Sequence, residues 1–154
     1  MKPSEVLAIC KKVAPAHGFD PLLIMAVCLQ ESGYDQTEVR LEQNFYRKYT
    51  RPQNLPTTDE VLLAASYGLM QLMGESLLEA GYFGAWSYGN IQRKIDALME
   101  SPELQVEMGC RWLKHKMDDR QTTNVELGLR AYNGSAEYPP LVFQKWDELK
   151  KEYP

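Results

Sequence analysis

The carboxylate of Glu31 stands at the end of the most apolar stretch of the chain. Residues Leu22 to Leu29 are all apolar, and we expect them to form a helix that is buried on every side. Burial and the negative end of that helix both disfavour an ionised carboxylate, so both raise its pKa. A carboxyl group that stays protonated near neutral pH can act as a general acid. Glu31 could instead lie solvated on the last exposed turn, and its position alone does not decide between the two.

Other residue types that often carry chemistry are isolated in this sequence. His17 and His115 do not stand at a metal-ligand spacing, and there is no phosphate-binding glycine loop and no Ser/His/Asp set. The chain has an odd number of cysteines, namely Cys10, Cys28 and Cys110, so they cannot all pair in disulfides. We interpret them as reduced packing residues. We therefore expect neither a metal nor a cofactor.

Composition is that of an ordinary folded domain. The 154 residues are 44% hydrophobic and 25% charged, which predicts one domain over residues 1–154. A formal net charge of −4 gives no general attraction to nucleic acid. No run approaches the roughly 20 apolar residues that span a bilayer, so we expect no membrane insertion, and we expect a monomer.

The helices that would position Glu31 are marked at both ends. Asp20-Pro21 combines an N-cap with proline at the first helical position, and Gly33 follows the last turn. Residues 35–57 lose helical periodicity and carry two prolines, which predicts a long loop with short helical pieces. Helical spacing returns beyond residue 58 and continues to the end, and no useful period-2 alternation occurs. The predicted fold class is all-α, or nearly so.

Three segments together resemble the lysozyme-like lytic transglycosylases, of the soluble lytic transglycosylase and goose-type lysozyme kind. The first runs from Ala16 to Tyr34 and contains Glu31-Ser32, which resembles the buried helix ending in the family's catalytic Glu-Ser. The second, Ala65 to Met73, contains Gly68-Leu69-Met70-Gln71. The third, Leu129 to Gly134, contains Ala131-Tyr132-Asn133. Each motif is weak alone, but their order over roughly residues 4–135 is specific, and it implies a compact helical domain with a central buried helix ending at the catalytic Glu.

The resemblance implies a role for each matched residue. Glu31 would protonate the glycosidic oxygen between N-acetylmuramic acid (MurNAc) and N-acetylglucosamine (GlcNAc), and would then take the proton of the muramyl 6-hydroxyl as a 1,6-anhydro ring closes. Tyr132 would hydrogen-bond Glu31 and hold it in place; the alternative is a tyrosine that only packs in the core. The substrate-contacting residues implied are Gln71, Asn133, Met70 and Ser32. The alternatives are capping for the two amides, core packing for the methionine, and a helix-terminal position for the serine.

The chain departs from the family in the number of residues between Glu31 and Gly68, which is larger than usual. Residues 35–57 thus look like an inserted loop beside the active site, and Val39 to Phe45 is similar to a motif of some phage muramidase-like proteins with a glutamate at the Glu42 position. Cations and aromatic residues interleave there, and could grip acidic peptide stems and stack on sugars, or simply form a solvated face. The residues concerned are Arg40, Arg47, Lys48, Arg51, Phe45, Tyr46 and Tyr49.

A second carboxylate would turn the lyase into a hydrolase, because ordinary glycosidases use two. The candidates are Glu42 and Glu60, although Glu60 lies in a predicted first helical turn, where acidic residues are favoured for stability alone. A third hypothesis is a structural or glycan-binding virion component with little turnover. The N-terminus lacks the apolar run and cleavage site of a secretory signal. We therefore expect synthesis in the cytosol, a phage origin as an endolysin or virion protein, and peptidoglycan glycan strands as the partner.

Overall fold

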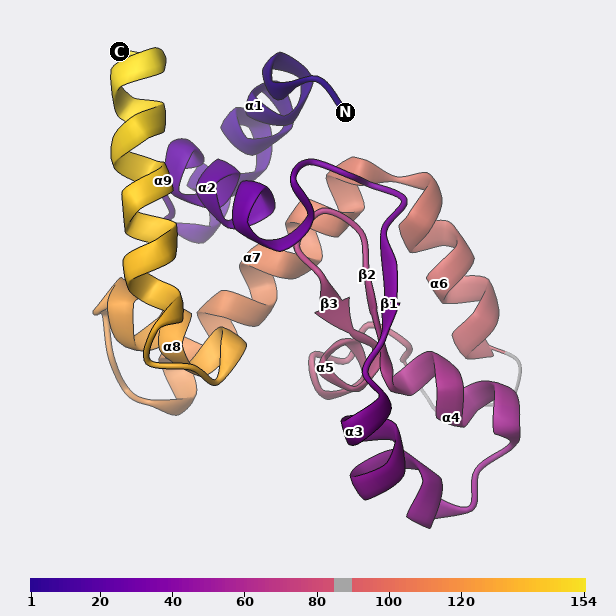
Figure 1. The fold of residues 1–154 in the computed structure, drawn as a ribbon. Helices are drawn as coiled ribbons and strands as arrows, with labels where there is room; N and C mark the ends of the chain where they lie inside the picture. Colours follow the sequence, from indigo (N-terminus) through magenta and orange to yellow (C-terminus); the bar gives the residue numbers. More distant parts are fainter. Residues whose placement is uncertain (85–89) are drawn as a thin grey trace.

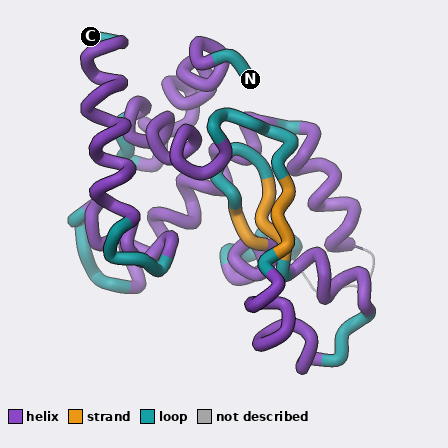
Figure 2. The backbone as a smooth tube through the Cα atoms, viewed as in Figure 1, coloured by secondary structure: helices purple, strands orange, loops and turns teal. Residues whose placement is uncertain are grey.

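The computed structural model describes residues 1–84 and 90–154, and shows helices grouped around a small sheet (Figure 1; Figure 2). In chain order the elements are α1 (Pro3–Val13), η1 (Ala14–His17), α2 (Pro21–Ser32), β1 (Val39–Leu41), α3 (Gln43–Phe45), η2 (Tyr46–Thr50), η3 (Arg51–Gln53), α4 (Thr57–Leu63), β2 (Ala65–Tyr67), β3 (Leu72–Met73), α5 (Gly74–Glu79), α6 (Asn90–Glu100), α7 (Pro102–Asp119), α8 (Val125–Asn133) and α9 (Tyr138–Glu152). The fold is mostly helical, as predicted.

Helix α2 is the buried centre of one part of the molecule, with α1 and α9 packed on it (Figure 1). The carboxylate of Asp20 accepts hydrogen bonds from the N–H groups of the second and third helical residues at 2.7 and 3.3 Å, and Pro21 is the first residue. Leu23 to Cys28 are all buried. Gly33 adopts the left-handed φ of 59° that ends the helix. These features confirm the predicted buried helix and its two boundaries.

Helix α7 joins two hydrophobic clusters through opposite faces. Val106 and Cys110 pack with α2, whereas Met108 and Trp112 pack with the sheet and α6. The helix starts at Ser101, whose hydroxyl accepts a hydrogen bond from the backbone N–H three residues on at 3.2 Å. The three cysteines are buried free thiols. One long amphipathic helix therefore fixes the position of α2 relative to the sheet.

The sheet has three short antiparallel strands in the order β1-β2-β3 (Figure 2). Arg40 in β1 lies opposite Ser66 in β2, and Tyr67 lies opposite Leu72 in β3. Strands of two or three residues are too short to produce a readable alternation, which is why the sequence did not reveal them. The four residues between β2 and β3 are the Gly68-Leu69-Met70-Gln71 motif, so that motif forms a hairpin turn.

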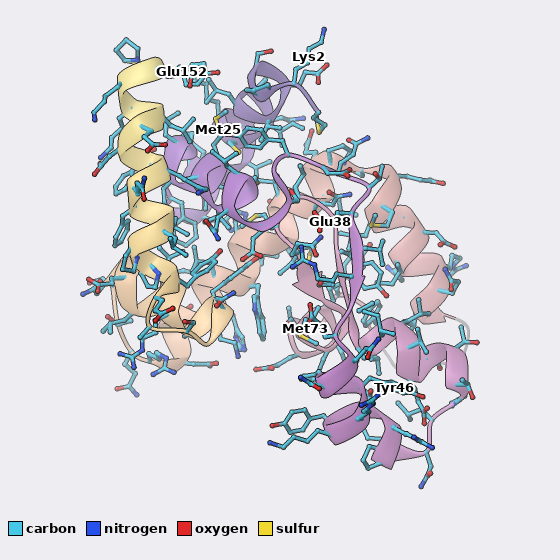
Figure 3. All side chains as sticks on the ribbon, viewed as in Figure 1. Lys2, Met25, Glu38, Tyr46, Met73 and Glu152 are labelled. Atoms are coloured by element: carbon cyan, nitrogen blue, oxygen red, sulfur yellow. The ribbon has the colours of Figure 1, made fainter. Side chains whose placement is uncertain are left out.

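The segment over residues 35–57 carries more structure than the predicted loop with helical pieces. It supplies the edge strand β1 and then continues as α3, one π-helical turn (η2) and one 3-10 turn (η3). Figure 3 labels Glu38 just before β1 and Tyr46 in the helical part beyond it. The segment thus adds an edge strand to the sheet.

Over the described residues, no single helix is both long and apolar enough to cross a membrane. The stretches Pro3–His17 and Pro21–Ser32 meet the length and composition test only as a pair, and they are bent by 119° at their junction.

Candidate active site

Glu31 lies in the last turn of α2, half-buried at the wall of a hollow of about 370 Å³. Burial is the largest influence on its carboxyl group and raises the pKa above the usual value. A hydrogen bond from Tyr138 and the positive charge of Arg40 lower the pKa in part. The predicted direction is confirmed: this carboxyl group holds its proton to higher pH than a solvated one does.

The tyrosine that holds Glu31 is Tyr138, and the prediction of Tyr132 for this bond was wrong. The hydroxyl of Tyr138 donates to Glu31 Oε1 at 2.6 Å, from the first residue of α9. The hydroxyl of Tyr132 instead donates to the backbone carbonyl of Met70 at 2.6 Å. The two rings lie nearly parallel, with centroids 6.3 Å apart. Helix α9 packs along α2 and brings its first residue to the end of that helix, while Tyr132 at the end of α8 meets the β2–β3 turn.

The β2–β3 turn is fixed to its neighbours by hydrogen bonds from side chains. Ser32 Oγ donates to the carbonyls of Cys28 (3.1 Å) and Leu69 (2.9 Å), which ties the end of α2 to the turn. Gln105, in α7, accepts from the N–H of Leu69 at 2.9 Å. The hydroxyl hydrogen of Ser32 is thus engaged within the protein, and the contact of Ser32 with substrate stays a prediction.

Gln71 lines the hollow, but its amide is largely engaged within the protein. Its Nε2 donates to the carbonyls of Glu38 (3.1 Å) and Gly68 (2.9 Å), and its Oε1 accepts from the hydroxyl of Ser66 at 3.0 Å. Its backbone φ is 46°, in the left-handed region. Because an amide nitrogen has two hydrogens, the predicted sugar contact could come only from the remaining acceptor site on Oε1.

Met70 does not line the hollow, so the prediction that it forms a wall of the sugar cleft was wrong. Its side chain is 0% exposed and packs on α7, where a β-carbon added to Gly109 would overlap its sulfur. The reversal of the chain at Gln71 turns Met70 into the core and places Met73, three residues on, at the hollow. The alternative of core packing was the correct one.

The two candidates for a second carboxylate are separated by the fold. Glu42 lies at the end of β1 and lines the same hollow as Glu31, where its charge is one of those that raise the pKa of Glu31. Glu60 is buried in the first turn of α4 and lines neither this hollow nor the adjoining one described below. Its carboxylate accepts a long hydrogen bond of 3.4 Å from Tyr46. Of the two, only Glu42 is placed to act on a molecule bound beside Glu31.

A second hollow of about 290 Å³ adjoins the first. The first is lined by Glu31, Arg40, Glu42, Asn44, Phe45, Ser66, Gln71, Met73, Tyr132 and Asn133. The second is lined by Gln30, Glu31, Arg40, Asn133, Ser135, Glu137, Tyr138 and Leu141. Both share Glu31, Arg40 and Asn133, so the predicted Asn133 lies near Glu31 and both residues border the two hollows.

Sequence reasoning missed Tyr138 and Met73 as site residues. Tyr138 precedes two prolines at the start of a helix, which marks the helix boundary but not the direction in which its first side chain points. Phe45 and Asn44 came from the segment predicted to lie beside the active site, and they do line the hollow.

Among the described residues, one group of side chains is close enough to hold a metal ion, and it is remote from Glu31 in sequence. Glu79, His115 and Asp119 bring one ligand atom each within 4.8 Å of one another. The ammonium group of Lys116 lies 3.2 Å from Glu79 and 3.9 Å from Asp119. These carboxylates thus already have a cationic partner.

The order of the motifs and the site geometry agree with a comparison against protein families. The model of the transglycosylase SLT domain matches residues 9–139, which include Glu31, the β2–β3 turn and Tyr138. The chain belongs to the transglycosylase SLT domain family. Membership in this family indicates a peptidoglycan-cleaving enzyme of the lytic transglycosylase type. No curated protein and no solved structure shows significant similarity to the chain.

The bond from Tyr138 to Glu31 predicts a pH effect in this SLT-domain protein. Tyr138→Phe removes a hydrogen bond that lowers the pKa of Glu31, so that pKa rises further in the variant. The high-pH limb of the kcat/KM profile, where the acid loses its proton, is expected to move to higher pH. Loss of orientation is expected to lower kcat about tenfold, since a hydrogen bond to a charged group contributes roughly 1.5–3 kcal/mol. Tyr132→Phe is the matched control, and an equal shift of its pH profile would contradict the assignment.

Proposed function

We propose that this protein cleaves the bond between MurNAc and GlcNAc in peptidoglycan, as a lytic transglycosylase that leaves 1,6-anhydroMurNAc ends. The observation that carries the proposal is Glu31: a half-buried carboxyl group with a raised pKa, held by Tyr138, at the point where two hollows meet. An acid placed between two binding hollows suits a bond inside a strand. Sugar rings on both sides of the bond can then be held while it breaks.

In the proposed reaction one residue serves as acid and then as base. Protonated Glu31 gives its proton to the glycosidic oxygen, and the bond from C1 of MurNAc to that oxygen breaks. The carbonyl oxygen of the substrate's own N-acetyl group stabilises the positive charge that develops at C1. Ionised Glu31 then takes the proton from the 6-hydroxyl of the same sugar, and O6 bonds to C1. Protons and electrons balance without a water molecule, and Glu31 returns to its protonated form.

Mass spectrometry of digested peptidoglycan tests the product. The lyase is expected to give muropeptides that end in 1,6-anhydroMurNAc, each lighter by one water molecule than the product of hydrolysis. Digestion in water enriched in oxygen-18 adds a second readout, because a lyase incorporates none of the label. Reducing ends that carry the label, with no anhydro product, would rule out the proposed reaction.

A muramidase hydrolase on the same fold is the second candidate, because Glu42 shares the hollow with Glu31. If Glu31 works alone, Glu42→Gln is expected to keep the anhydro product and to lower kcat by less than about tenfold. If Glu42 activates water, the loss is expected to be about 10²-fold or more. The negative charge of Glu42 raises the pKa of Glu31, so its removal should move the high-pH limb of the kcat/KM profile to lower pH, opposite to Tyr138→Phe. Glu60→Gln, which changes a carboxylate outside the hollows, should leave that limb in place.

A further inference from the structure

Arg40 stands at the point where the two hollows meet. It is the central residue of β1, it lines both hollows, and it shares this position with Glu31 and Asn133. Its backbone is fixed by pairing with Ser66 in β2, whose hydroxyl also donates to the carbonyl of Arg40 at 3.3 Å. A side chain that starts from a paired strand is held more precisely than one on a loop.

The guanidinium group of Arg40 is oriented by an ion pair with Glu38, and this pair does not engage all of its N–H donors. One of its nitrogens, Nη2, lies 2.5 Å from Glu38 Oε1, and the side chain is 53% exposed. A guanidinium has five N–H donors, so the contact with Glu38 leaves donors on the exposed side. The ion pair therefore holds the group in one orientation while leaving it able to bind a second anion.

Arg40 is also the one cation among the described residues that line either hollow. The other acidic side chains there are Glu42 and Glu137, and Glu31, whose raised pKa favours its neutral form. An anionic group on a bound molecule therefore has one cationic partner available among these lining residues, which is Arg40. Such an arrangement affects the position at which an acidic group binds more than it affects the affinity for the whole molecule.

In a glycan strand of alternating GlcNAc and MurNAc, the sugar rings are neutral. The acid is carried by the lactyl side chain of MurNAc, either as its own carboxylate or as a carboxylate of the peptide attached to it. This side chain belongs to the same ring whose C1–O bond Glu31 would cleave. We propose that Arg40 binds the carboxylate carried by the lactyl side chain of MurNAc, and so sets which of the two sugars is placed at Glu31. The inference rests on the proposed function and adds the residue that determines its specificity.

Binding to inactive protein tests this assignment without turnover. In the Glu31→Gln background, Arg40 is compared with Arg40→Gln and Arg40→Lys by calorimetry. The ligands are a GlcNAc-MurNAc tetrasaccharide with free lactyl carboxylates, the same tetrasaccharide bearing peptides, and chitotetraose, which is neutral. Arg47→Gln is the matched control, because Arg47 is an exposed arginine of the same segment that lines neither hollow.

Arg40→Gln is expected to weaken binding of an acid-bearing tetrasaccharide about tenfold or more, in line with a charge-assisted hydrogen bond. Binding of chitotetraose should change less than about twofold, and Arg40→Lys should restore part of the loss. Loss with the lactyl acid alone, or with the peptide-bearing ligand alone, identifies which carboxylate is bound. An equal loss for chitotetraose, or no loss for either acid, would overturn the inference. If the Glu31→Gln protein binds none of the three glycans, the proposed function itself fails, and this outcome is distinct from the others.

Discussion

Replacing Glu31 by glutamine is expected to lower kcat on peptidoglycan by about 10³-fold, within the range that general acid–base catalysis contributes. Glutamine keeps the shape of the side chain and can still accept the hydrogen bond from Tyr138, but it has no proton to give to the glycosidic oxygen. The rate of release of soluble muropeptides, compared with that of Glu100→Gln, measures the effect. Glu100 is an exposed carboxylate in α6 that lines neither hollow, so its variant should retain full activity.

Activity that survived in Glu31→Gln would contradict both catalytic proposals, because each of them needs the proton of Glu31. The same variant gives a stability readout with a definite sign. The folded protein raises the pKa of Glu31, so it binds more protons than the unfolded chain between the ordinary and the raised pKa, and it loses stability as the pH rises through that interval. Glu31→Gln should therefore unfold at higher denaturant concentration than wild type at neutral pH. The difference should vanish below the ordinary carboxyl pKa.

Gly68→Ala is expected to lower the free energy of unfolding by about 2–5 kcal/mol. Gly68 has a φ of 68°, which is unfavourable for alanine, and an added β-carbon would overlap the amide of Gln105. That amide cannot move away cheaply. It is 1% exposed, and it bonds the N–H of Leu69 at 2.9 Å and the carbonyls of Gln36 and Leu98 at 3.1 and 3.2 Å.

Gly18→Ala separates the two causes of this loss. Gly18 has a φ of 77° but nothing within 4 Å of an added β-carbon, so its variant should lose only the backbone term of about 1–2 kcal/mol. Urea unfolding at neutral pH gives the free energy of unfolding for both variants. Equal losses would show that Gln105 yields, and that the β2–β3 turn is less firmly fixed than its hydrogen bonds indicate. A larger loss in Gly68→Ala should be accompanied by lower activity, because this turn supplies the acceptor of Tyr132 and positions Gln71.

Local interactions let the sequence alone determine the helix that carries Glu31. Asp20, Pro21 and Gly33 act within one or two turns of themselves, and an unbroken apolar run must be buried on all sides, so α2 and its two ends could be predicted. The raised pKa of Glu31 followed from the same burial. The ordered motifs predicted the family and the mostly helical fold. The strands between them were too short to leave a pattern.

Only the tertiary structure decided what surrounds Glu31. Tyr138 lies 107 residues from Glu31, and its bond depends on how α9 packs along α2, which no local pattern specifies. Met70 is buried in the core and Met73 lines the hollow, because the chain reverses at Gln71. Glu42 reaches the hollow and Glu60 does not because β1 pairs with β2. Caps and periodicity depend on neighbours in sequence, whereas a site is made where distant elements pack. The sequence therefore determined where Glu31 stands on its helix, and the packing decided its partners.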